Sequence, residues 1–351
     1  MKRNRLGSFK SKGVLVLAAV TIALTLPLVF QGSDRAQLKY AYVPNVADGT
    51  VSAIDLATNE VAWTLPIGEE TAMGIAASPD GRYVYTGDAT TKEFIIIDAE
   101  KQEIVSRVSI SHGVHAIDVS PDGRYVWVGG GLESYPWLSA LSVVNTETGG
   151  VEAVLSPALG NGAHFAFTPD GAEVWIASIT TNLVWVMDAA SGEVLAAVPL
   201  TRAPVQGRTP EAELGLIGFN EVAISPDGER AYAVGPEAAI VYAIDVLTRK
   251  VIGTVQAGER AHGIAVSRDG REVWTADRGG TVTVIDAETL QVQATIPMGE
   301  YANHIAFSLD GRYAYVSRTE DLAVIDAKTR QIIELIPMGN QPHEISLEDR
   351  Y

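Results

Sequence analysis

The feature that most constrains this chain is a turn motif that occurs six times. It consists of Ser or Thr, one further residue and then Asp-Gly, and each copy follows a short apolar run. The Asp can accept bonds from nearby backbone and the Gly tolerates positive φ, so the motif is typical of a tight turn between strands. Most copies lie about 42 residues apart, which is the repeat length of a β-propeller blade. The six aspartates are Asp80, Asp122, Asp170, Asp227, Asp269 and Asp310.

Residues 262–299 form the clearest copy of the repeat. They contain four short apolar runs rich in β-branched residues, separated by turn residues such as Asp269-Gly270 and Gly279-Gly280. Such runs predict strands, and four of them without an intervening helix predict an antiparallel meander. The runs are residues 264–266, 273–274, 282–285 and 292–296.

The two ends of the chain supply one blade between them. The repeat begins at its second strand, Tyr40–Asn45, and residues 343–348 have the pattern of the missing first strand. We therefore predict an all-β fold, a seven-bladed β-propeller of four-stranded antiparallel blades over residues 39–351, closed by pairing the C-terminal strand with the N-terminal three. Aspartates that recur after each third strand are expected to cap turns, and aromatic residues of the second strands, such as Tyr83 and Trp274, are expected in the core.

The repeat also resembles a known family. The pattern G-x-x-x-H-x-I-A-x-S-P-D-G-R-x-x-Y-V, followed by V-x-x-I-D-x-x-T and T-I-P-x-G, is similar to the YVTN-type β-propeller repeat. Here it is carried by Tyr40–Asn45, Thr281–Thr289 and Thr295–Gly299, and the resemblance covers residues 39–351. The family implies a propeller, and at the level of fold a likeness to amine dehydrogenase propeller subunits and haem d1 domains. It leaves the function open.

The N-terminus is typical of an exported protein. Residues 1–12 carry five basic side chains and no acid, and residues 13–30 are apolar throughout. Such a segment is an export signal or a membrane anchor. No clear cleavage site follows Phe30, which favours an anchor, with a cleaved signal as the alternative. Residues 31–38 read as a linker, and the propeller is expected in the periplasm or at the cell surface.

Composition limits the partners. The chain has no cysteine, so no disulfide stabilises the fold, and its formal charge is −17. Nucleic-acid binding would need a basic face, so we expect no nucleic-acid partner. The acidic excess suits a basic protein such as a cytochrome, although a merely solvated surface has the same composition.

Two expected insertions extend one face of the propeller. Residues 129–137 would lengthen a loop between second and third strands, and residues 201–219 would lengthen a connection between blades. Long loops on a rigid scaffold are common binding sites, which makes Glu133, Tyr135 and Trp137 candidate contact residues for a protein or small-molecule ligand. Neutral variation in loop length is the alternative.

Histidines concentrate on the same face. Five of the six begin an innermost strand, and Glu221 shares the register of two of them. Imidazoles at one channel mouth suit copper, zinc or haem iron, with His115, His164, His262 and His304 as candidate metal ligands. The alternative is that each ring bonds the backbone of the next blade. The full set is His115, His164, His262, His304 and His343.

Strand register limits how many of these rings can converge. Adjacent residues of a strand point to opposite sides, so the rings of neighbouring blades should alternate, and we expect at most two or three at one metal, with a carboxylate or water. No motif for a catalytic nucleophile or a phosphate loop is found, and no catalytic residue is assigned. The sequence thus favours an extracytoplasmic binding or scaffold module; the alternative is a metal- or cofactor-dependent redox subunit with a histidine-lined site.

Overall fold

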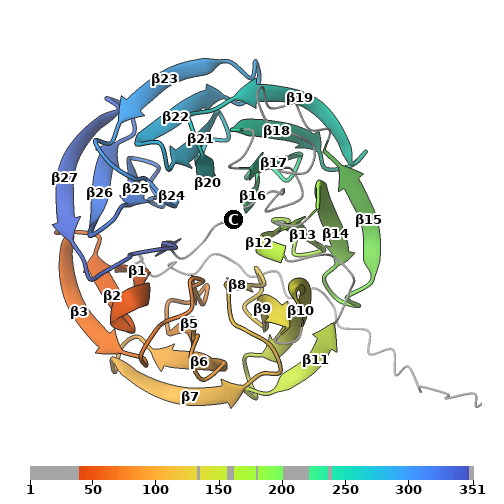
Figure 1. Cartoon of the computed structure of the whole chain (residues 1–351), viewed down its shortest axis with the longest axis vertical. Helices are drawn as coiled ribbons and strands as arrows, with labels where there is room; N and C mark the ends of the chain where they lie inside the picture. The colour runs from red at the N-terminus through yellow and green to blue at the C-terminus, as the bar shows by residue number, and fades with distance from the viewer. Residues whose placement is uncertain are drawn as a thin grey trace, which may run out of the picture. The chain divides into compact units, whose positions relative to one another are not determined.

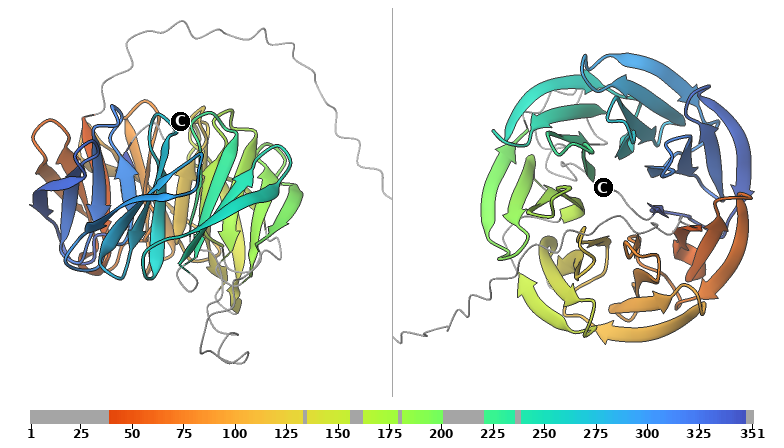
Figure 2. Two further views of the ribbon diagram at one scale, coloured as in Figure 1. Left: turned by 90° about the horizontal axis from the view of Figure 1, so that it is seen from above. Right: turned by 180° about the vertical axis from the view of Figure 1, so that it is seen from behind.

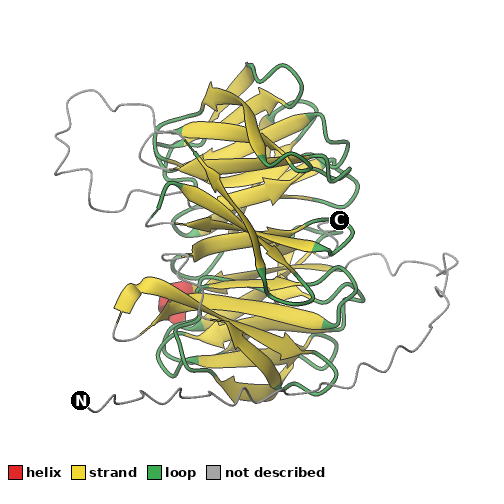
Figure 3. Ribbon diagram, turned by 90° about the vertical axis from the view of Figure 1, so that its right-hand side faces the viewer, coloured by secondary structure: helices red, strands yellow, loops and turns green. Residues whose placement is uncertain are grey.

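The computed structural model describes residues 39–132, 135–155, 162–178, 181–200, 221–235 and 239–347. Seven four-stranded antiparallel sheets stand in a ring around a central channel (Figure 1). The left view of Figure 2 and Figure 3 show the propeller edge-on, with its strands crossing the thickness of the disc, and the right view of Figure 2 shows the ring from behind. The predicted all-β, seven-bladed propeller is confirmed.

The blades are numbered here along the chain, and the innermost strand of each is given first. Blade 1 combines both ends of the described chain, with β28 Ser346–Leu347, β1 Tyr40–Asn45, β2 Thr50–Asp55 and β3 Glu60–Pro66. A short 3-10 helix, η1 Val46–Asp48, connects β1 to β2. Blade 2 has β4 Ala76–Ala77, β5 Tyr83–Asp88, β6 Glu93–Asp98 and β7 Glu103–Ser109. Blade 3 has β8 Ala116–Val119, β9 Tyr125–Leu132, β10 Tyr135–Asn145 and β11 Val151–Leu155.

The remaining blades follow the same order. Blade 4 has β12 Gly162–Phe167, β13 Glu173–Ser178, β14 Leu183–Asp188 and β15 Val194–Pro199. Blade 5 has β16 Glu221–Ile224, β17 Arg230–Gly235, β18 Ile240–Asp245 and β19 Lys250–Gln256. Blade 6 has β20 Ala261–Val266, β21 Glu272–Asp277, β22 Thr281–Asp286 and β23 Val292–Pro297. Blade 7 has β24 Ile305–Phe307, β25 Tyr313–Ser317, β26 Asp321–Asp326 and β27 Gln331–Pro337.

The predicted ring closure is confirmed. β28 pairs antiparallel with β1, with Leu347 opposite Ala41 and Ser346 opposite Tyr42. The side chains of Ile345 and Leu347 are buried in a cluster with residues of blades 1 and 7. Among the described residues of the predicted strand 343–348, the paired strand begins at Ser346, and His343 joins blade 1 through one backbone bond, from its N–H to the Pro44 carbonyl at 3.1 Å.

The recurring turn motif is explained by its hydrogen bonds. In blade 2 the Ser78 hydroxyl donates to Asp80 Oδ1 at 2.6 Å and accepts from the Tyr83 backbone N–H at 2.9 Å. Gly81 adopts a φ of 73°, which glycine tolerates without strain. The expected caps after the third strands are also present; for example, Asp286 Oδ1 accepts from the Thr289 backbone N–H at 2.7 Å.

The core lies between neighbouring blades. Trp274 of β21, for instance, packs in one cluster with Phe307 and Ala314 of blade 7. Several of the second-strand aromatics are fully buried as expected, among them Tyr85, Trp127, Trp175, Trp274 and Tyr315. Tyr83, Tyr125 and Tyr313 are only half-buried, because each is the first residue of its strand, next to the turn, where a neighbouring arginine lies over its ring.

One expectation was wrong. Residues 129–131 are not in a loop: they continue β9 and pair with β10, Gly129 opposite Leu141 and Gly130 opposite Ala140. A glycine is needed at position 130, because a Cβ there would lie 1.8 Å from the Gly113 carbonyl oxygen. The run therefore permits close approach of two backbone segments and does not form a flexible loop.

Several sequence expectations fall outside the described residues. These are the basic segment, the apolar stretch 13–30, the linker, Glu133 and the insertion 201–219. Across the described ranges no helix has the length and apolar character needed to cross a membrane.

Candidate functional site

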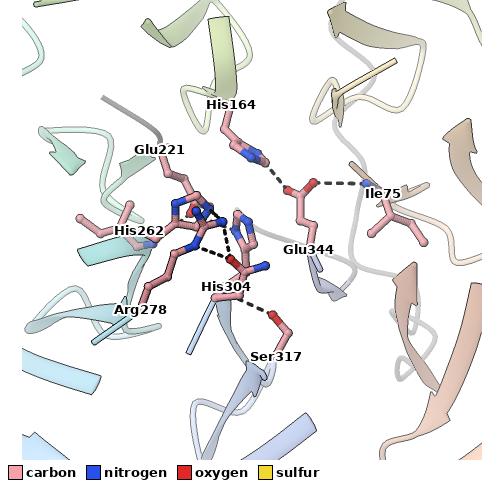
Figure 4. Close-up of polar contacts among 10 residues, drawn as sticks. Ile75, His164, Glu221, His262, Arg278, His304, Ser317 and Glu344 are labelled. Carbon is pink, nitrogen blue, oxygen red and sulfur yellow. Dashed lines mark hydrogen bonds and ion pairs between the residues drawn. The ribbon is translucent and has the colours of Figure 1, made fainter. Parts of the chain in front are cut away.

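In six of the blades, a titratable residue lies at the start of the innermost strand and faces the central channel. Blades 3, 4, 6, 7 and 1 each contribute one of the five histidines, and blade 5 contributes Glu221. Figure 4 labels four of these residues, His164, Glu221, His262 and His304, and shows their side chains pointing toward one another. Four of the five histidines are buried, and His304 has only 1% of its surface exposed.

The imidazole rings form a continuous chain of contacts. Ring centroids are 5.7 Å apart for His115 and His164, and 4.9 Å apart for His164 and His304. His304 also lies 5.0 Å from His262 and 4.5 Å from His343. We call these five residues the histidine cluster. His304 is its centre, because it contacts three of the other four rings.

Three members of the cluster converge on one point. His262, His304 and His343 come from the consecutive blades 6, 7 and 1, and each offers one ring nitrogen within 4.8 Å of those of the other two. We call these three residues the tripod. Two tripod members, His262 and His304, were predicted from the sequence as metal ligands. The other two predicted ligands, His115 and His164, lie beside the tripod. The third tripod member is His343, which was not in the predicted set of ligands.

The rings do not alternate as strand register suggested. His304 contacts both His262 and His343. The strand register had predicted that only one of these two pairs of rings would face a shared gap between blades. His304 and His343 precede β24 and β28 and have no strand conformation, so the alternation of a strand does not apply to them.

Two carboxylates hold the cluster. Glu221 Oε2 lies 3.2 Å from His304 Nδ1 and accepts a hydrogen bond from the Ile264 backbone N–H at 3.1 Å. Glu344 Oε2 accepts from the Ile75 N–H at 3.2 Å, and its Oε1 lies 3.8 Å from His164 Nδ1. Each carboxylate therefore joins the next blade's backbone to an imidazole further round the ring.

Glu344 was missed by the sequence reasoning, although its signal was present. It occupies the same position of the repeat as Glu221, His164 and His304, one residue after His343. Aligning acids as well as histidines on the inner strand would have found it.

Arg278 was also missed, because it comes from the turn between β21 and β22 and not from an inner strand. Its Nη2 lies 2.6 Å from His262 Nε2, and its Nε and Nη2 donate to Asn303 Oδ1 at 3.0 and 2.7 Å. The guanidinium also lies over the Tyr301 ring, 5.1 Å from its centroid. Asn303 and Tyr301 thus hold the arginine side chain against the tripod.

Burial favours the neutral form of three of these imidazoles, those of His115, His262 and His343. Burial, and secondarily the neighbouring His164, lowers the pKa of His115 to about 4. Burial together with His304 holds the pKa of His262 well below its usual value, and the same causes act on the pKa of His343. Neutral imidazole is the form that binds metals, so these rings need lose no proton at neutral pH to act as ligands.

A cavity of about 100 Å³ lies in the channel next to the cluster. Glu221, His304 and Glu344 line it together with small side chains of the inner strands, such as Ala223 and Ala306. A water occupies about 30 Å³ in the liquid, so the cavity suits a few waters or an ion.

The remaining sequence candidates lie apart from the cluster or outside the description. His112 is buried, with Nε2 2.8 Å from Ser142 Oγ and Nδ1 2.7 Å from the Gly113 carbonyl oxygen, which is a structural role. Tyr135 and Trp137 lie in β10, but their side chains are not among those described, and Glu133 is outside the described residues. Their role in partner binding stays a prediction.

Comparison with known proteins gives one family match. The model of the cytochrome D1 heme domain matches residues 219–304. This stretch is about a quarter of the chain and contains Glu221, His262, Arg278 and His304. No curated protein matches the sequence.

Solved structures share the fold. One is a chain described as Kuenenia stuttgartiensis hydrazine synthase, with a TM-score of 0.71, 16% identity and coverage of 82% of this chain and 92% of that chain. Another is described as dihydro-heme d1 dehydrogenase NirN in complex with DHE, with a TM-score of 0.65, 20% identity and coverage of 90% of this chain and 76% of that chain. The class that fold and site define is a seven-bladed propeller with a buried histidine cluster in its channel.

Proposed function

We propose that this chain is an extracytoplasmic redox-associated propeller that binds a metal-centred cofactor through the tripod. The observation that carries the proposal is the tripod, three buried histidines from three blades with a nitrogen of each within 4.8 Å of the others. The family match over residues 219–304 and the likeness to dihydro-heme d1 dehydrogenase NirN in complex with DHE support a haem-type group as the cofactor.

The donor atoms of the site suit haem, but the volume of the cavity does not. Neutral imidazole is a common axial ligand of haem iron, and Arg278 supplies a cation for an acidic substituent. However, the channel cavity of about 100 Å³ is well below the roughly 300 Å³ of a small ligand pocket. The cavity that the described residues enclose therefore has room for a metal ion but not for a tetrapyrrole.

The residues of the site have separable tasks. When bound, a redox metal centre would supply one-electron chemistry. His262, His304 and His343 would hold it, Glu221 orients the ring of His304, and the buried surroundings exclude bulk water. The clustering of three buried imidazole donors favours a defined coordination geometry over adventitious surface binding.

The N-terminal segment and the net charge of the chain fit the same proposal. The basic N-terminal segment and the apolar residues 13–30 support export, with the propeller in the periplasm or at the surface and a membrane anchor as one form of attachment. The formal charge of −17 suits a basic electron-transfer partner such as a cytochrome and argues against nucleic acid.

The test is reconstitution of the untagged propeller, residues 39–351, with haem and, separately, with copper, zinc and iron ions. A stoichiometric complex with a Soret band, or a one-to-one ion complex by calorimetry, supports the proposal. If neither forms and the protein is folded by circular dichroism, the histidine cluster is structural and the binding or scaffold reading of the fold takes its place.

A further inference from the structure

We infer that the tripod His262, His304 and His343 binds a single first-row transition-metal ion directly, and that Arg278, which contacts His262, competes with the ion and must withdraw for binding. The inference rests on the proposed function, in that it assumes that the cluster binds a metal centre. It goes further by naming the ligand atoms, the class of ion and the group that competes with it.

Glu221 defines the state of the central ring. Its Oε2 lies 3.2 Å from His304 Nδ1, and the same oxygen is fixed by the Ile264 N–H. A carboxylate accepts only, so the proton of neutral His304 is on Nδ1 and Nε2 is the nitrogen that can ligate a metal. A carboxylate behind a ligating imidazole is a recurrent way to orient the ring and raise its basicity.

His343 supplies the second donor. Its Nδ1 is buried and has no hydrogen-bond partner among the described residues. A buried polar atom without a partner costs about 1–3 kcal/mol, and a metal bond at this nitrogen would remove that cost. The ring is within contact of His304, with centroids 4.5 Å apart, so both donors reach the same space.

Arg278 conflicts with ligation by His262. Its guanidinium can only donate, so His262 Nε2, at 2.6 Å, must present its lone pair and Nδ1 must carry the proton. A neutral imidazole has one lone pair, and it cannot serve Arg278 and a metal together. If Nδ1 became the ligand instead, the proton would move to Nε2 and face the N–H groups of the arginine. Either ligation therefore requires Arg278 to move.

The geometry is close to that of a bound ion. Three imidazole nitrogens at 2.0–2.1 Å from a tetrahedral ion lie about 3.4 Å apart. The tripod nitrogens lie within 4.8 Å of one another, a difference that rotations of the side chains can close. Imidazole donors suit zinc, copper, iron and nickel, and the chain has no cysteine to supply a thiolate. The fourth position is left for water.

The experiment titrates untagged protein of residues 39–351 with Zn²⁺ by calorimetry, and with Co²⁺ to read a tetrahedral d–d spectrum. We expect one site per chain. His304→Ala and His343→Ala should abolish it, Glu221→Gln should weaken it about 10- to 100-fold, and Arg278→Met should strengthen it about tenfold or more because a competing cation is removed. Circular dichroism on every variant confirms folding.

Two variants serve as matched controls. His115→Gln removes a cluster imidazole outside the tripod and should leave Zn²⁺ affinity within about twofold. Arg271→Met removes the same charge from the exposed turn at the other end of β21, and should not strengthen binding. Unchanged affinity in Arg278→Met would overturn the role of the arginine.

The outcomes also separate this inference from the proposed function. Binding of haem without binding of a bare ion would overturn the tripod as an ion site and leave the proposed function standing. Binding of an ion that persists in folded His304→Ala and His343→Ala would overturn the assignment of the ligands. Absence of both haem and ion binding would overturn the two together.

Discussion

His304 Nδ1 and Glu221 Oε2 lie 3.2 Å apart, although their blades, 7 and 5, are separated by blade 6. The carboxylate reaches past β20, where it also accepts the Ile264 N–H. One side chain thus connects three consecutive blades at the channel. The site is therefore a property of the closed ring, and a single blade could not assemble it.

The closure of the ring can be tested with one core substitution. Leu347 of β28 is buried between blades 1 and 7, so Leu347→Ala should lower the free energy of unfolding by about 2–5 kcal/mol. Chemical denaturation measures the loss. Leu335→Ala on the outer strand β27, where the side chain is 48% exposed, is the control and should change stability by no more than about 0.5 kcal/mol.

Deletion of residues 342–351 extends this test. The N-terminal three strands of blade 1 would then have no inner strand, and cooperative unfolding should be lost because β1 would present an unpaired edge beside the channel. A truncated protein that melts as the full chain does would contradict the role given to β28.

The close approach at Gly130 predicts a second effect on stability. A Cβ at this position would lie 1.8 Å from the Gly113 carbonyl oxygen, which is backbone and cannot move aside without shifting a strand. Gly130→Ala should therefore destabilise the protein by about 1–3 kcal/mol. Gly150→Ala in the same blade, where the nearest atom is a Thr148 side-chain oxygen at 3.4 Å, should change the melting temperature little.

The histidine cluster predicts how stability depends on pH. The pKa of His115 falls from 6.5 to about 4 on folding, and the pKa values of His262 and His343 fall as well. Below pH 6.5 the unfolded chain therefore binds more protons than the folded one, so stability falls as the pH drops from about 7 towards 4. Each such histidine contributes a slope of up to about 1.4 kcal/mol per pH unit.

Urea denaturation of the metal-free protein between pH 7 and pH 4 measures this slope. Replacing His115 with Gln should make the slope shallower, since the glutamine binds no proton. A variant with the full slope of the parent would show that other groups cause the acid sensitivity.

The N-terminal segment gives a prediction that rests on sequence alone. Because residues 13–30 are apolar, follow a basic stretch and lack a clear cleavage site, the protein should fractionate with membranes, with the propeller open to added protease. N-terminal sequencing is the decisive measurement. A soluble form that begins near residue 32 would show that the segment is a cleaved signal.

Most of the fold could be predicted because its signals are local. The Ser-x-Asp-Gly turn satisfies its own hydrogen bonds, as Ser78 and Asp80 show, so each copy marks a hairpin wherever it stands. The glycines 129–131 were misplaced because a glycine run has the composition of a loop. Only the neighbouring Gly113 carbonyl, which is remote from Gly130 in sequence, reveals that the run is a strand under a close contact.

The sequence by itself determined the number of blades, the closure of the ring and the gathering of histidines at one end of the inner strands. Each follows from a repeat whose register can be counted. Only the tertiary structure decided that His343 joins His262 and His304, that His115 and His164 lie beside them, and that Arg278 and Glu344 belong to the site. The physical reason is that convergence depends on the order of blades around a closed ring and on residues that lie just outside the strands, where the alternation of side chains no longer applies.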